Sequence, residues 1–190
     1  MMRTAVRHAA ILFALLIGAA ALSHAQTYRA VDIEAEEQKA ELFIAERIAV
    51  ERARFAPDAR PLASDSALTK IARERSGEMA EGAPFAHEDE QGRFAAAGKV
   101  HVRFGPYGAI GENIVLERDS SGSFEAEAFA RRAVQNWMNS EGHRAAILSP
   151  LFDRNGVGVV FKGTAAYATQ VFWGPPKQAA ARVFGTRRRR

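Results

Sequence analysis

Two histidines and one glutamate, far apart in the chain, are the side chains best suited to chemistry: His87, Glu112 and His143. Glu112 lies in a largely apolar segment, where a polar side chain is unusual, and the histidines lie in segments that mix apolar and polar residues. Two imidazoles and a carboxylate can transfer a proton or hold a divalent ion such as Zn²⁺, with the histidines as its ligands. Glu112 would then be a third ligand, orient a histidine, or act as a general base. If the fold brings the three together, they form a site.

Familiar catalytic motifs are absent from the sequence. The run from His87 to Glu90 lacks the His-Glu-x-x-His spacing of zinc peptidases. There is no Gly-x-Ser-x-Gly motif, and there is no cysteine to act as a nucleophile. Hydrolysis would therefore depend on His87, Glu112 and His143 alone.

The candidate residues and their neighbours also have structural interpretations. His87 can hold a loop in place through a backbone carbonyl. Glu112 can cap backbone amides, since a carboxylate in apolar surroundings must be paired. Asn113 is expected to fix a turn through its side-chain amide. Ser140 is expected at a helix N-cap rather than as a nucleophile.

Three more polar residues lie near these segments in the second half of the chain. Arg144 is expected to bind carboxylates or carbonyl oxygens of the protein rather than a substrate. For Tyr167 and Gln170 two positions stay open: in the wall of a ligand-binding cleft, or packed beneath it.

The first 25 residues have the features of a secretory signal peptide. Arg3 and Arg7 precede an apolar run from Ala9 to Leu22, and the small residues Ser23 and Ala25 lie at the positions that a signal peptidase reads. The apolar run is shorter than the roughly 20 residues that a membrane-spanning helix needs. We therefore expect export to the periplasm or the extracellular space, with no membrane anchor after cleavage; the alternative is an uncleaved anchor.

Charge and cysteine content narrow the possible partners. The formal net charge of the 190-residue chain is +4, and it falls to −2 without Arg3, Arg7 and the terminal run 187–190. Because the body is nearly neutral, no nucleic-acid partner is expected. The arginine tail would either contact anionic envelope polymers or lipid headgroups, or be a solvated end. With no cysteine, lipoprotein attachment and disulfides are excluded.

Hydrophobic periodicity predicts one domain without repeats. A helix is expected over residues 33–54, a second from Ser64 or Asp65 to about Gly82, and another from beyond residue 123 through Met138. Residues 92–98 look loosely helical, whereas residues 100–107 are ambiguous. The expected apolar stripes of the first two helices are Leu42, Ala45, Ile48 and Ala49, and Leu68, Ile71, Ala72 and Met79.

Strands are expected mainly late in the chain, at residues 110–116, 156–162 and 167–173. The last two are separated by Gly163-Thr164, which favours an antiparallel hairpin. Helices followed by strands indicate an α+β sandwich rather than repeated βαβ units.

Several short segments, in one order along the chain, carry a resemblance to a known family. They are Phe85-Ala86-His87, Gly111-Glu112-Asn113-Ile114, Trp137 with Ser140-Glu141-Gly142-His143-Arg144 and Ile147-Leu148, Gly156-Val157-Gly158, and Thr169-Gln170-Val171-Phe172. From about Leu42 to Trp173 the chain resembles a bacterial, SCP-like member of the CAP superfamily (cysteine-rich secretory proteins, antigen 5, pathogenesis-related 1). The resemblance implies a three-layer α-β-α sandwich whose central cleft gathers the polar residues.

The resemblance also implies a division of the chain and a set of site residues. Residues 1–25 would be the signal peptide, 26–41 a lead-in, 42–174 the CAP/SCP domain, and 175–190 an extension with an Arg-rich end. His87, Glu112 and His143 match the family's cleft residues. A further histidine and glutamate of the eukaryotic members have no counterpart, because Tyr167 or Ala168 and Ser140 stand near those positions.

Three functions follow as hypotheses, and whether the protein is an enzyme stays open. The first is an exported binding or interaction module for a lipid, a peptide or a cell-envelope polymer, with His87, Glu112, His143, Tyr167 and Gln170 in the cleft. The alternative is a metal-dependent, peptidase-like hydrolase that uses the two histidines as ligands and Glu112 as the catalytic group. The third is attachment to the envelope through the arginine tail.

Overall fold

The computed structural model describes residues 32–105 and 108–176. The predicted signal peptide, the lead-in up to residue 31 and the Arg-rich end lie outside these residues. The chain forms two compact units, Met1–Ala35 and Glu36–Arg190, and the architecture given below is that of the second.

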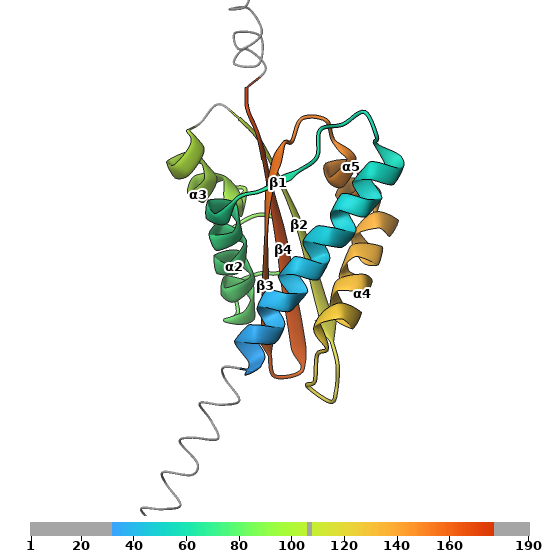
Figure 1. Ribbon diagram of the computed structural model, residues 1–190. Coiled ribbons are helices and arrows are strands. Elements are labelled where there is room, and N and C mark those ends of the chain that lie inside the picture. Colours follow the sequence, from blue (N-terminus) through green and yellow to red (C-terminus); the bar gives the residue numbers. More distant parts are fainter. Residues whose placement is uncertain (1–31, 106–107, 177–190) are drawn as a thin grey trace, which may run out of the picture. The chain divides into compact units, whose positions relative to one another are not determined.

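The second unit is a mixed sheet covered by helices on both faces (Figure 1). The strands, in the order β1-β3-β4-β2 across the sheet, are β1 (Ala63–Ser64), β3 (Arg154–Lys162), β4 (Ala165–Gly174) and β2 (Ala109–Arg118). One face carries α2 (Ser66–Ala80) and α3 (Ala95–Phe104); the other carries the part of the first helix that lies in this unit, residues 36–55, with α4 (Ala126–Asn139) and α5 (Glu141–Leu148). This confirms the predicted α+β class and three-layer α-β-α sandwich.

Each face of the sheet has its own apolar core, because successive side chains of a strand point to opposite faces. On β4, Phe172 packs in the core that contains Phe129 and Trp137 of α4. Its neighbour Val171 packs in the other core, with Leu68 of α2. The predicted hairpin is confirmed, since β3 and β4 pair antiparallel around Gly163, whose φ of 60° suits a glycine.

The first helix is confirmed, but only part of its predicted stripe is buried: Ile48 is buried and Ala45 packs against the core, whereas the other two members are exposed. Ala40, Ile44 and Ile48 are buried, whereas Leu42 is 65% exposed and Ala49 is exposed. The difference arises because the carboxylates of Glu37 and Glu41, in the same helix, also face the sheet.

Those two carboxylates bind backbone amides of β3. Glu41 accepts a hydrogen bond from the Val159 amide (3.2 Å), and Glu37 accepts one from the Phe161 amide (2.6 Å). β1 covers only Arg154 and Asn155 of β3, so the amides farther along that strand need other partners.

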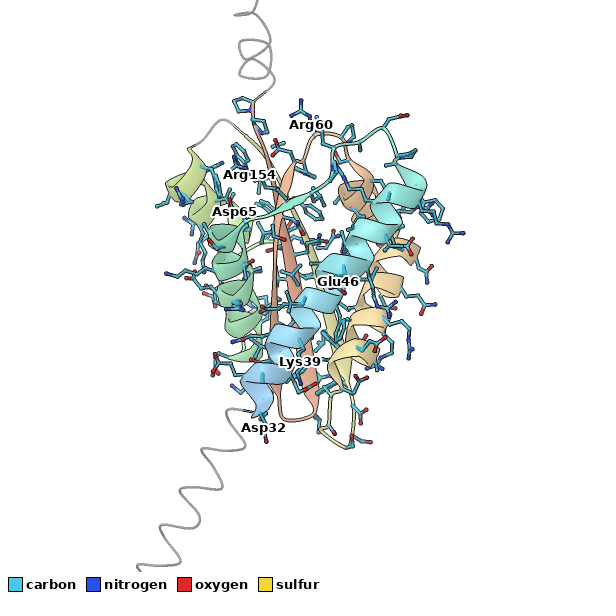
Figure 2. All side chains as sticks on the ribbon, in the orientation of Figure 1. Asp32, Lys39, Glu46, Arg60, Asp65 and Arg154 are labelled. Carbon is cyan, nitrogen blue, oxygen red and sulfur yellow. The ribbon has the colours of Figure 1, made fainter. Side chains whose placement is uncertain are left out.

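Two helix starts lie where the sequence predicts, but only one has its side-chain cap. Asp65 caps α2, because its Oδ1 accepts from the amides of Ala67 and Leu68, and its Oδ2 lies 3.4 Å from Arg154 (Figure 2). Ser140 precedes α5, but its side chain makes no capping hydrogen bond.

α3 corrects the predicted boundaries. It runs from Ala95 to Phe104, so it covers residues 100–104 of the stretch that the sequence left ambiguous and the last four of the seven residues expected to be helical, whereas residues 106–107 lie outside the described residues. Gly105, with a φ of 82°, ends it. Among the described residues, no helix combines the length and apolarity that crossing a membrane requires.

Candidate functional site

His87, Glu112 and His143 come together beside β2, the last strand at one side of the sheet. His87 lies in the segment between α2 and α3, Glu112 on β2 and His143 on α5. The His87 Nδ1 is 3.0 Å from Glu112 Oε2, and the two imidazole centroids are 5.8 Å apart. Alternation along β2 turns Glu112 toward α2 and Asn113 toward α5. The two histidines therefore approach from opposite faces of the sheet.

A fourth residue of the site, Arg75 on α2, was missed by sequence reasoning. It is 3% exposed, and its Nε donates to Glu112 Oε1 over 3.2 Å. Its other nitrogens donate to Glu78 and to the backbone carbonyl of Ala86, each over 3.0 Å. A signal was present, because Arg75 is four residues from Ile71 on the inward stripe of the helix. A charge there needs a buried partner.

Arg75 and His87 together engage both oxygens of Glu112. The Glu112 side chain is 0% exposed, so no water satisfies it from outside. Of the interpretations open for this residue, orientation of a histidine fits the geometry best. Capping of backbone amides does not, since the hydrogen bonds of Glu112 go to two side chains. For Glu112 to act as a third metal ligand or as a general base, one of its two buried hydrogen bonds would have to break.

The two imidazoles have different charge preferences. The hydrogen bond with Glu112 raises the pKa of His87 above its ordinary 6.5, although burial opposes the shift. Burial lowers the pKa of His143 below 6.5, and the charge of His87 lowers it further. At pH 6.5, His87 is therefore mostly protonated and His143 mostly neutral.

An NMR titration is expected to show this difference directly. The His87 ring should titrate above pH 6.5 and the His143 ring below it, whereas both should titrate near 6.5 in urea. In Glu112→Gln, the pKa of His87 should fall back toward 6.5, because the carboxylate charge is gone. His87 ring signals that titrate identically in the two proteins would contradict the assignment.

The same shifts make opposite contributions to stability. Because the folded pKa of His87 is raised, its contribution is fully present below pH 6.5 and is lost as the pH rises through the folded pKa. The folded pKa of His143 is lowered, so its neutral burial costs nothing above pH 6.5 and costs stability as the pH falls.

Asn113 and Gln170 lie beneath the histidines. The Asn113 side-chain amide donates to the backbone carbonyl of His143 (3.3 Å) and lies 3.5 Å from Gln170 Oε1. Gln170 is 0% exposed and donates to Asn155 over 2.9 Å. Of the two positions open for Gln170, the structure places it beneath the site. Asn113 attaches α5 to β2 instead of fixing a turn.

Tyr167 lies apart from the two histidines. On β4 it pairs with Leu116, four residues along from Val171, which pairs with Glu112. That separation corresponds to about 13 Å along a strand.

A hollow of about 680 Å³ adjoins the site and shares Arg75 with it. Its lining includes Phe94 and Pro84, but also charged residues of both signs, among them Glu88 and Lys99. The wall is therefore mixed rather than apolar, which suits a ligand that carries polar groups.

The residues present fit a metal ion only in part. In the described part of the chain, no three His, Cys, Asp or Glu side chains are grouped so that they could hold a metal. His87 and His143 could share an ion, because two ligands of one Zn²⁺ have ring centroids roughly 5–6 Å apart when each Zn–N bond is about 2.0–2.1 Å. Such an ion would take its other ligands from water or substrate, with Glu112 orienting His87.

The order of the motifs, the α-β-α sandwich and the paired histidines indicate a CAP-type domain. Sequence comparison confirms this class. The profile of the cysteine-rich secretory protein family, CAP, matches residues 48–173, about two thirds of the chain. The chain therefore belongs to the CAP family, even though it has no cysteine.

Three of the matched relatives are bacterial proteins. Protein YkwD of Bacillus subtilis is 34% identical over 106 residues, which cover 55% of this chain and 37% of YkwD. The chain thus spans little more than a third of that relative. An extracellular SCP-domain protein of Bacillus anthracis superimposes with a TM-score of 0.57 at 27% identity, over 73% of this chain and 41% of its own. An outer surface protein of Borrelia burgdorferi shares the fold, with a TM-score of 0.57 at 18% identity, over 69% of this chain and 89% of its own.

Proposed function

We propose that this chain is an exported CAP-domain binding module that holds an acidic group of a lipid, peptide or envelope-polymer ligand at His87 and His143. The observation that carries the proposal is the state of Glu112, whose two oxygens are already bonded to Arg75 and His87. With its carboxylate engaged, the site presents imidazole donors instead of a free base.

The charge of the site supports an acidic ligand group. His87 is protonated at mildly acidic pH, and 37% of its side chain is exposed. Glu112 holds Nδ1, so Nε2 is the ring nitrogen left to donate to a ligand. A carboxylate that bridges toward His143 would also relieve the repulsion that lowers the pKa of that ring.

Two observations support export. Residues 1–25 have the pattern of a signal peptide, and the Bacillus anthracis protein with the SCP domain is described as extracellular. The arginine tail would add contact with anionic envelope components, as a secondary role.

A binding experiment separates this function from metal-dependent hydrolysis. An apolar fluorescent probe is bound to the protein and displaced with palmitate, with palmityl alcohol and with short peptides. Carboxylate ligands should displace the probe about tenfold more weakly from His87→Ala than from the unchanged protein, since a charge-assisted hydrogen bond is lost. Their affinity should fall from pH 6 to pH 8 and should not respond to EDTA.

The alternative hypothesis, a metal-dependent hydrolase, predicts the opposite results. Peptide cleavage that requires Zn²⁺, stops with EDTA and disappears in His143→Ala would establish the hydrolase and overturn the binding module. Uncharged palmityl alcohol serves as the matched ligand, because it should be insensitive to both the pH and the His87 substitution.

A further inference from the structure

A second hollow, of about 410 Å³, lies among the first helix (residues 36–55), α4 and α5. Its lining includes four arginines, Arg47, Arg54, Arg131 and Arg144, but only one carboxylate, Glu51. It shares no residue with the histidine site. So high a density of one charge contrasts with the nearly neutral body of the chain.

Two of the arginines are positioned by an aromatic ring. The guanidinium carbons of Arg54 and Arg144 each lie 4.8 Å from the centroid of the Phe55 ring. Stacking occupies the flat face of a guanidinium and leaves its N–H edges free to bind an anion in bidentate fashion. The expectation that Arg144 binds a carboxylate or carbonyl of the protein is wrong within the described residues, where its contact is with Phe55.

Most of this positive charge is uncompensated. Arg47 pairs with Glu127 over 3.3 Å. Arg54, Arg131 and Arg144 form no ion pair with another described residue, and all three are exposed. Even after Glu51 is counted against them, the hollow keeps a net charge of about +2 at neutral pH.

The hollow also has an apolar side. Val50, Phe55, Val134 and Met138 contribute to its lining, and Val50 and Phe55 are 65% and 43% exposed. Exposed apolar side chains beside unpaired cations indicate a ligand with both characters. The volume falls within the range of small-molecule sites, about 300–1,000 Å³.

We propose that this hollow binds a small organic phosphate, with the phosphate group on Arg54, Arg131 and Arg144 and its apolar substituent against Val50 and Met138. A phosphate monoester carries about −1.5 to −2 charges at neutral pH and three acceptor oxygens. It can therefore engage several guanidinium edges, whereas a single carboxylate needs only one.

Calorimetric titration of the full chain with phenyl phosphate, inorganic phosphate and benzoate tests the proposal. Phenyl phosphate should bind about tenfold more tightly than inorganic phosphate, because it also buries an apolar ring. Benzoate should bind more weakly than phenyl phosphate. Arg54→Ala with Arg144→Ala should weaken phenyl phosphate binding at least about tenfold, through the loss of charge-assisted hydrogen bonds.

Two control variants isolate the site. Arg132→Ala removes the arginine next to Arg131, which pairs with Glu117 and does not line the hollow, so binding should not change. His87→Ala should not change it either, which separates this site from the histidine site. An equal loss in Arg132→Ala, no saturation by phenyl phosphate, or binding only to phosphatidylglycerol vesicles would each overturn the proposal.

Discussion

Replacing Glu112 with alanine is expected to lower the free energy of unfolding by about 3–5 kcal/mol, because it leaves a buried charge without its partner. Arg75 is 3% exposed and would lose the one fully buried carboxylate that neutralises it. Its remaining contacts, with Glu78 and the Ala86 carbonyl, lie nearer the solvent. Urea unfolding followed by circular dichroism measures the change.

Glu78→Ala is the matched control, because it removes the other carboxylate of the same arginine. Glu78 is 43% exposed, so its loss should cost no more than about 1 kcal/mol. Replacing Arg75 and Glu112 together by Met and Leu should restore much of the stability lost in Glu112→Ala, because neither charge is then left alone. If Glu112→Ala and Glu78→Ala were equally stable, the buried pair would not have the role assigned to it.

Gly158→Ala is expected to cost about 3 kcal/mol or more of the free energy of unfolding, because the added methyl group has no room. A Cβ at this position would lie less than 3.0 Å from backbone atoms of Ala72 and Arg73 in α2. A Cβ at Gly156 would likewise lie less than 3.0 Å from backbone atoms of Leu68 and Thr69, one turn earlier in α2. The helix axis and the strand would have to separate, and the core on that face would open. Thermal unfolding of the variant measures the loss.

Gly77→Ala tests the same substitution where there is room. Gly77 lies in α2, and a Cβ there would meet nothing within 4 Å. Because alanine favours a helix over glycine, this variant should be more stable by roughly 0.5–1 kcal/mol. A Gly158→Ala protein as stable as the unchanged one would mean that α2 does not rest directly on β3.

Sequence reasoning located the elements well where one face of the element is apolar. The inward residues of α2 and the β3–β4 hairpin lie where periodicity predicts, because their burial follows from the spacing of apolar side chains. It was only partly right about the buried face of the first helix, where Ile48 and Ala45 face the core but Leu42 and Ala49 are exposed. There the inward positions include Glu37 and Glu41, whose partners are backbone amides of a strand more than 100 residues later.

The histidines show the same division between what the local sequence predicts and what depends on distant segments of the chain. Their residue type and the family motifs around them mark His87 and His143 as candidates, but whether they meet depends on α5 and the segment after α2 reaching the same edge of the sheet from opposite faces. Arg75 could be suspected from its place on the inward stripe of α2, yet its partner Glu112 could not be chosen among the chain's carboxylates. The choice depends on which face of β2 that residue occupies.

The amino-acid sequence by itself therefore determined the family, most of the longer helices and strands, and the short set of side chains that could do chemistry. These follow from local spacing and residue type. Only the tertiary structure decided that Glu112 is already paired with Arg75 and His87, that Gly156 and Gly158 let α2 rest on the sheet, and that four arginines gather around one hollow. Pairing, close approach and charge density depend on distances through space between segments that the chain order leaves far apart.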